Sequence, residues 1–68
     1  MHKHKFVIGD TITVAGVQGT IFTLGYAVNG TRKFHVCPSG FEVPDENPLG
    51  YQVDFGRKVK IIKESDIL

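Results

Sequence analysis

Apolar and polar residues alternate with a period of two in several short segments of this chain, which is the pattern of half-buried β-strands. Val, Ile, Thr, Phe and Tyr dominate these segments and favour a pleated surface. Eight glycines and three prolines separate them, so no long stretch before the C-terminus keeps a helical period. The chain is therefore expected to be all-β, with strands at residues 11–14, 20–28, 31–36, 51–55 and 58–61.

Turn signals join the predicted strands into hairpins. The strongest is Asn29-Gly30, because a type I′ turn needs two residues that accept a positive φ. A second two-residue turn, Gly56-Arg57, joins the last two strands and is expected to pair Asp54 with Lys58 across them. Gly25 interrupts the longest strand and indicates a bulge or a bend there.

The alternation also assigns each side chain to a face. In the third strand, Phe34 and Val36 are expected to point inward, and Lys33, His35 and Cys37 outward. In the last hairpin, the residues expected on the inner face are Tyr51, Val53, Phe55, Val59 and Ile61. Those expected to face solvent are Gln52, Asp54, Lys58 and Lys60.

Five short strands without crossover helices predict a meander or a small barrel, and closure is favoured because it removes sheet edges. A long loop at residues 38–50 separates the third strand from the fourth, and Phe41 and Val43 are expected to pin it to the core. Residues 64–68 are expected to form one closing helical turn. With 68 residues there is room for one domain, at residues 6–68, preceded by a flexible basic segment at residues 1–5.

Composition excludes several classes of protein. The hydrophobic fraction of 41% and the charged fraction of 22% are those of an ordinary globular domain rather than a disordered chain. Apolar runs such as Phe6-Val7-Ile8 are too short for a transmembrane span or a signal peptide. A single cysteine, Cys37, cannot form an internal disulfide, which predicts a cytoplasmic protein.

Residues able to ligate a metal are few and poorly spaced. His2 and His4 alternate with lysines that would repel a cation, so they are expected to be solvated. His35 and Cys37 share one strand face, but a structural zinc site needs four ligands. No metal site or cofactor is predicted.

Catalytic signals are equally sparse. Ser39 lacks the strand-to-helix context of a nucleophile turn. Glu42, Asp45 and Glu46 lie in the long loop without calcium-ligand spacing and are expected to form a solvated acidic tip. No catalytic residue is predicted, and the chain is expected not to be an enzyme.

Basic residues form the clearest functional cluster. They are Arg57, Lys58, Lys60 and Lys63, with Arg32 and Lys33 expected nearby. Several phosphate contacts would give salt-sensitive nucleic-acid binding, and Tyr26, Phe41 or Tyr51 could add base stacking if they face outward. Alternatively, the lysines are the solubilising face of an edge hairpin, where lysine is common.

The two ends of the sequence resemble a known family of small barrels. Two segments, Ile8-Gly9-Asp10-Thr11-Ile12-Thr13-Val14 and Gly19-Thr20-Ile21, resemble the start of SH3-like barrels of the KOW and Tudor-like kind. The segment Tyr51-Gln52-Val53-Asp54-Phe55, followed by Val59 and Glu64-Ser65-Asp66-Ile67-Leu68, is similar to their last two strands and closing turn. The resemblance covers roughly residues 6–28 and 51–68. It implies a binding domain, since such families bind RNA, DNA, ribosomes, polymerase or modified peptides, or serve as accessory subunits.

Three hypotheses for the function follow. The leading one is a non-enzymatic module that docks onto a larger protein or nucleoprotein assembly through its loops, above all residues 38–50. The second is direct RNA or DNA binding through the basic cluster at residues 57–63. The third is a small oligomeric enzyme whose site forms between subunits. The residues expected to meet a partner are Arg32, Lys33, Arg57, Lys58, Lys60, Lys63, Tyr26, Phe41 and Tyr51.

Overall fold

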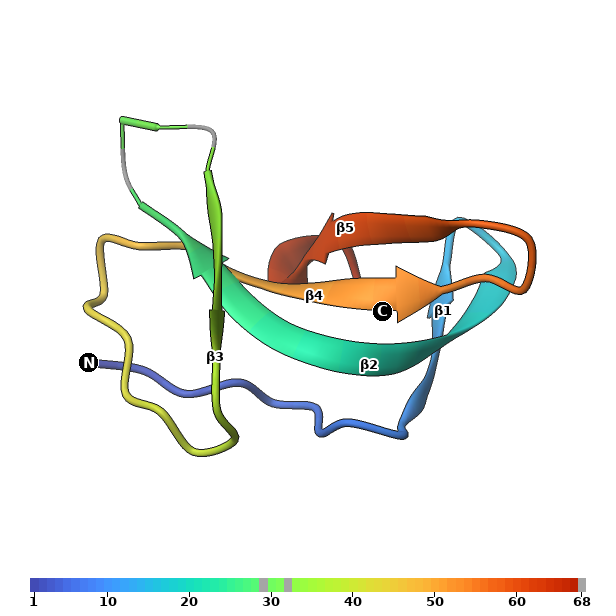
Figure 1. Cartoon of the computed structure of the whole chain (residues 1–68), viewed down its shortest axis with the longest axis horizontal. Helices are drawn as coiled ribbons and strands as arrows, with labels where there is room; N and C mark the ends of the chain where they lie inside the picture. The colour runs from blue at the N-terminus through green and yellow to red at the C-terminus, as the bar shows by residue number, and fades with distance from the viewer. Residues whose placement is uncertain (29, 32, 68) are drawn as a thin grey trace.

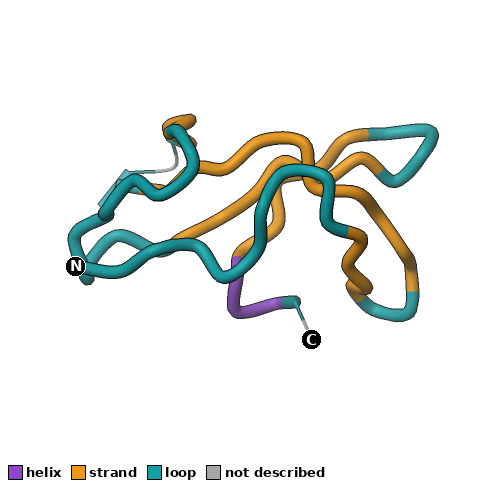
Figure 2. Tube along the Cα trace, turned by 90° about the horizontal axis from the view of Figure 1, so that it is seen from below, coloured by secondary structure: helices purple, strands orange, loops and turns teal. Residues whose placement is uncertain are grey.

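A computed structural model describes residues 1–28, 30–31 and 33–67 of the chain. Its strands are β1 (Thr11–Val14), β2 (Val17–Ala27), β3 (Phe34–Cys37), β4 (Leu49–Asp54) and β5 (Val59–Lys63) (Figure 1). A short 3-10 turn, η1 (Glu64–Asp66), follows β5 and lies on one side of the curved strands (Figure 2). The predicted all-β fold with five strands and a closing turn is confirmed, although Leu68 at the end of the predicted turn lies outside the described residues.

All five strands belong to one antiparallel sheet curled around the long strand β2. The path through the sheet is β1-β2-β4-β5, and β3 pairs with the second half of β2. In Figure 1, β2 sweeps beneath β4 while β1 and β3 cross its two ends. Among the described residues β1 does not pair with β5, so the sheet is a half-barrel and keeps both of these edges open.

The bulge in β2 lies at Phe22 and not at Gly25. Ile21 pairs with Val53 and Thr23 with Gln52, so Phe22 is the extra residue. A bulge changes which residues of a strand face the core, and here Ile21 and Leu24 both become buried.

The core lies on the inner, concave face of the half-barrel. A cluster of buried side chains fills it, with Ile62 and Ile67 among the half-buried residues packed against it. The buried apolar residues are Ile12, Ile21, Leu24, Cys37, Val43, Leu49, Tyr51 and Val53. Of the two residues expected to pin the long loop to the core, Val43 is completely buried, whereas Phe41 is 40% exposed and stacks on Tyr26.

The predicted faces of β3 are wrong. Val36 is 64% exposed, whereas Cys37 is only 7% exposed and belongs to the core. The bulge at Phe22 turns Leu24 inward, and Cys37, its partner across the strands, follows it. Phe34 shares the outer face with Val36, although its ring is half-buried. Asn29, in the turn predicted to join β2 to β3, lies outside the described residues.

The predicted faces of β5 are wrong as well. The two-residue turn is present, but it places Phe55 opposite Lys58, whose carbonyl oxygen accepts a hydrogen bond of 2.9 Å from the Phe55 N–H. Partners across a sheet share a face, so Ile62 takes the inner side and Val59 and Ile61 point outward. Asp54 pairs with Val59 rather than Lys58, and its carboxylate accepts a hydrogen bond from the N–H of Gly56.

Candidate functional site

The outer face of the half-barrel carries exposed apolar side chains, and two of them, Val59 and Ile61, were expected on the inner face. Val59 is 51% exposed and Ile61 is 55% exposed, and both point outward from the edge strand β5. Phe22, at the bulge of β2, is 43% exposed, and Gln52 lies between this bulge and Ile61 in the sheet. We call Phe22, Val59 and Ile61 the outer apolar patch. Sequence reasoning placed Val59 and Ile61 inward because it paired Lys58 with Asp54, whereas Lys58 lies opposite Phe55.

An outer groove of about 330 Å³ adjoins this patch. Phe34 and Ile61 are among its apolar lining residues, and Lys33 and Lys63 are its basic ones. Its other lining residues are Ala27, Thr31, Pro48, Leu49 and Gly50.

Two glycines make room for the Phe34 ring on this face. Gly25 and Gly50 are paired across β2 and β4. A Cβ added to Gly50 would lie 3.1 Å from the ring of Phe34, and one added to Gly25 would collide with that ring and with the His35 carbonyl oxygen. The close approach of Phe34 is therefore the reason for glycine at position 25.

The basic residues predicted as one cluster lie on both faces of the sheet. Lys63 and Lys33 line the outer groove, whereas Lys58 and Lys60 line a groove on the inner side. Arg57 is exposed in the turn between β4 and β5, and Arg32 lies outside the described residues. None of these four lysines forms an ion pair within the described ranges. The arrangement places two lysines on each side rather than one continuous basic track.

The inner groove has a volume of about 240 Å³ and separates the turn after β1 from β5. Its lining is apolar except for Lys58 and Lys60, and no carboxylate contributes to it. The apolar residues are Val14, Ala15, Val17, Phe55 and Ile62.

The aromatic residues predicted to stack on a partner are engaged within the fold. Tyr26 stacks on His35 with ring centroids 5.5 Å apart and on Phe41 at 6.1 Å. Phe41 remains partly exposed, but Tyr51 is completely buried. The ring of Tyr51 is thus part of the core in this structure.

The hydroxyl of Tyr51 joins the two ends of the chain. It donates a 2.5 Å hydrogen bond to Oε2 of Glu64 in η1 and accepts one of 3.2 Å from the Phe6 N–H. The same carboxylate oxygen accepts a hydrogen bond from the N–H of Lys5. Burial, followed by the hydrogen bond to Glu64, raises the pKa of Tyr51 well above its usual range. The pair therefore holds the N-terminal segment to the closing turn.

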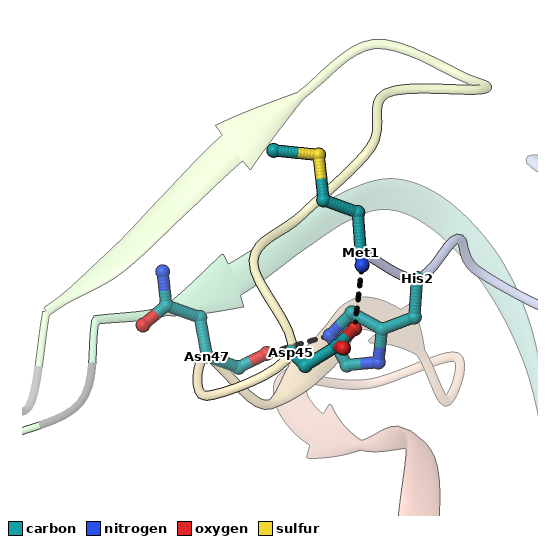
Figure 3. Close-up of polar contacts among 4 residues, drawn as sticks. All are labelled: Met1, His2, Asp45 and Asn47. Carbon is teal, nitrogen blue, oxygen red and sulfur yellow. Dashed lines mark hydrogen bonds and ion pairs between the residues drawn. The ribbon is translucent and has the colours of Figure 1, made fainter.

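Residues 1–5 lie against the fold, whereas the sequence predicts a solvated segment. His2 pairs with Val43 through backbone hydrogen bonds, and its Nε2 donates to the carbonyl oxygen of Asn47 at 2.9 Å (Figure 3). The Met1 ammonium lies 2.9 Å from Oδ1 of Asp45, and this hydrogen-bonded contact lowers the pKa of the Asp45 carboxyl. The long loop expected to recognise a partner is thus attached to the N-terminal segment.

His4 anchors this segment in the middle of the sheet. Its Nε2 lies 2.6 Å from the carbonyl oxygen of Gly25 and 3.1 Å from that of Gly50. Carbonyl oxygens only accept, so Nε2 carries the hydrogen. The imidazole also meets the ring of Tyr51 edge-on, with centroids 5.1 Å apart. Both histidines therefore have structural partners.

The described residues include no group of three or more side chains suited to a metal ion. Over the same part of the chain, no helix has the length and apolar character needed to cross a membrane. Comparisons with protein-family models, curated proteins and solved structures give no match. The architecture, a small all-β half-barrel, is compatible with an SH3-like barrel.

Proposed function

We propose that this chain is a non-enzymatic binding module of the SH3-like kind that docks onto a larger protein assembly through its outer face. The observation that carries the proposal is the register of the β4–β5 hairpin, which turns Val59 and Ile61 into solvent on the outer face of the edge strand β5. The partner surface is apolar and bears carboxylates, because Lys33 and Lys63 lie in the adjoining groove.

Apolar side chains exposed to water raise the free energy of the domain, and a partner that covers them would lower it. Complete burial of a Val, Ile or Phe side chain contributes about 1.5–3 kcal/mol. Since the three patch residues are each roughly half exposed, covering them contributes on the order of 2–4 kcal/mol in all. That is a large amount for a domain of 68 residues, whose whole stability is about 3–10 kcal/mol.

Docking through the outer face replaces the earlier hypothesis of docking through residues 38–50. His2 pairs with Val43, and the Met1 ammonium contacts Asp45, so part of this loop already has partners within the chain. No comparable contact covers Val59 or Ile61 within the described ranges.

Nucleic-acid binding through residues 57–63 has less support. The lysines divide between two faces, which leaves two phosphate contacts on each. Two contacts give weak binding, since nucleic-acid affinity grows with the number of phosphates neutralised. If the alternative holds, binding to single-stranded or duplex nucleic acid should fall steeply with salt and disappear on reversing the charges of Lys58 and Lys60.

Co-purification with a matched pair of variants tests the proposal. Ile61→Glu places a charge in the outer apolar patch, and Ile8→Glu makes the same change at a residue of similar exposure, 57% against 55%, in the loop before β1. The wild type and Ile8→Glu should retain the same protein at a constant ratio in pull-downs from the native cell, and Ile61→Glu should lose it. Circular dichroism should show that both variants are folded. Retention of that protein by Ile61→Glu would contradict the proposal.

A further inference from the structure

We infer that the free edge of β5 accepts an extended segment of the partner protein, with alternating apolar and acidic side chains, as an added strand beside the inner groove. The inference rests on the proposed function and specifies how that partner is held. Three features carry it: the open backbone edge of β5, the groove between this edge and the turn after β1, and the charge of the groove.

The backbone edge of β5 has unused hydrogen-bonding groups. The Phe55 N–H donates to the carbonyl oxygen of Lys58, and hydrogen-bonded pairs alternate along an antiparallel ladder. With the register observed, Lys60 and Ile62 bond to β4, whereas the N–H and C=O groups of Val59, Ile61 and Lys63 point away from it. No described strand pairs with that side of β5. Five residues of edge are about 17 Å long, enough for a short added strand.

Beyond this edge the fold leaves space for the side chains of such a strand. Val14 and Val17 line one part of the inner groove, and Phe55 and Ile62 line another. Because β1 and β5 do not pair within the described ranges, a strand added to β5 extends the half-barrel toward β1. Side chains on the inner face of the added strand would then lie in this groove, and those on its outer face would lie beside Val59 and Ile61.

Charge determines what kind of strand fits. On the inner side, the residues that an added strand would meet are Lys58, Lys60 and Ile62, and no carboxylate lines this groove. On the outer side the strand would meet Val59 and Ile61 and, at the end of β5, Lys63. A complementary segment therefore has carboxylates opposite the lysines and apolar side chains on its other face. A second copy of β5 fits less well, because it brings its own lysines into the same space.

A designed peptide tests the pairing directly. The probe is a capped ten-residue peptide of alternating Glu and Val, and its matched control has the same composition arranged as a block of Val followed by a block of Glu. Amide hydrogen exchange, read residue by residue by NMR, should show slower exchange at Val59, Ile61 and Lys63 by about tenfold or more with the alternating peptide. The block peptide should leave exchange at these three amides unchanged.

A charge swap tests the side-chain recognition. Lys60→Glu should weaken binding of the Glu-containing peptide by about fivefold or more and should improve binding of a peptide with Lys in place of Glu. Lys3→Glu, the same change at an exposed residue of the N-terminal segment, should alter neither affinity.

The outcomes separate this inference from the proposed function. Absence of binding by the alternating peptide, or binding without slower exchange at the three amides, overturns strand addition. If Ile61→Glu still loses the cellular partner in that case, docking through the outer face is supported and only strand addition is rejected. Protection that rises with protein concentration in the absence of peptide would assign the edge to a second copy and would likewise overturn the inference.

Discussion

Replacing Tyr51 by phenylalanine removes one hydroxyl group from the contact that joins the N-terminal segment to η1. That oxygen donates to Glu64 at 2.5 Å and accepts from the N–H of Phe6 at 3.2 Å. The ring itself is completely buried and keeps its packing in the variant, so the substitution isolates the hydrogen bonds.

The expected loss of stability follows from these two contacts. A hydrogen bond to a charged group contributes about 1.5–3 kcal/mol, and the Phe6 N–H loses its acceptor as well. Both contacts are part-buried, which favours a total near 2–3 kcal/mol. For a domain of this size that corresponds to a fall in Tm of about 10–20 °C.

Urea and thermal unfolding followed by far-ultraviolet circular dichroism measure this loss, since the chain has no tryptophan to report by fluorescence. Tyr26→Phe is the matched control, because its hydroxyl makes no hydrogen bond within the described residues and its ring is half-buried. The control should change the free energy of unfolding by less than about 0.5 kcal/mol. Equal, small effects of the two substitutions would refute the assigned role of the Tyr51 hydroxyl.

The pH dependence supplies a second check on the same residue. Burial and the Glu64 hydrogen bond raise the pKa of Tyr51 in the folded protein. Below about pH 10 the phenol keeps its proton in both the folded and the unfolded chain. Above it the unfolded chain loses that proton first, which favours unfolding. The stability advantage of the wild type over Tyr51→Phe should therefore shrink progressively as the pH rises above about 10. A constant difference would contradict the raised pKa.

Three further predictions concern the packing of β3 against β2. Gly25→Ala should destabilise the fold by more than Gly50→Ala in urea titrations, because only the former brings a Cβ into collision with a backbone carbonyl as well as a ring. Val36→Ser should change the free energy of unfolding by less than about 0.5 kcal/mol, whereas Cys37→Ser should lower it by about 1–3 kcal/mol. A larger loss for Val36→Ser than for Cys37→Ser would mean that Val36 faces the core and Cys37 faces solvent. Burial raises the pKa of the Cys37 thiol, so alkylation by iodoacetamide should be at least about tenfold slower in the folded protein than in urea, and equal rates would contradict its place in the core.

Strand identity was predictable from the sequence because turn residues and β-branched residues mark the strands locally. Each expected strand overlaps an observed one, but the starts differ: β2 begins at Val17 instead of Thr20, β3 at Phe34 instead of Thr31, and β4 at Leu49 instead of Tyr51. Which side chains face the core was less predictable, because the face of each residue is assigned by alternation along its strand. One inserted residue or one shifted pair therefore reverses every assignment that depends on it. One bulge at Phe22 reversed the faces of β3, and the pairing of Phe55 with Lys58 reversed those of β5.

The candidate docking surface and the anchored N-terminus depend on contacts between distant parts of the chain. His4 meets the carbonyl oxygens of Gly25 and Gly50, which are 21 and 46 residues away. No local pattern indicates that glycines at these positions expose carbonyl groups to an imidazole on one side and accept the Phe34 ring on the other. Lys58 and Lys60 are exposed, as expected, but the register of the last hairpin places them on the face opposite Lys63.

Site-specific photo-crosslinking in the native cell tests the central claim most directly. A benzophenone amino acid is placed in turn at Val59 and Ile61 on the outer face, at Ser39 and Glu46 in the long loop, and at Ile8. Docking through the outer face predicts crosslinks to one and the same protein from Val59 and Ile61, with none from the other three positions. Crosslinks from Ser39 or Glu46 in the absence of any from Ile61 would contradict the account.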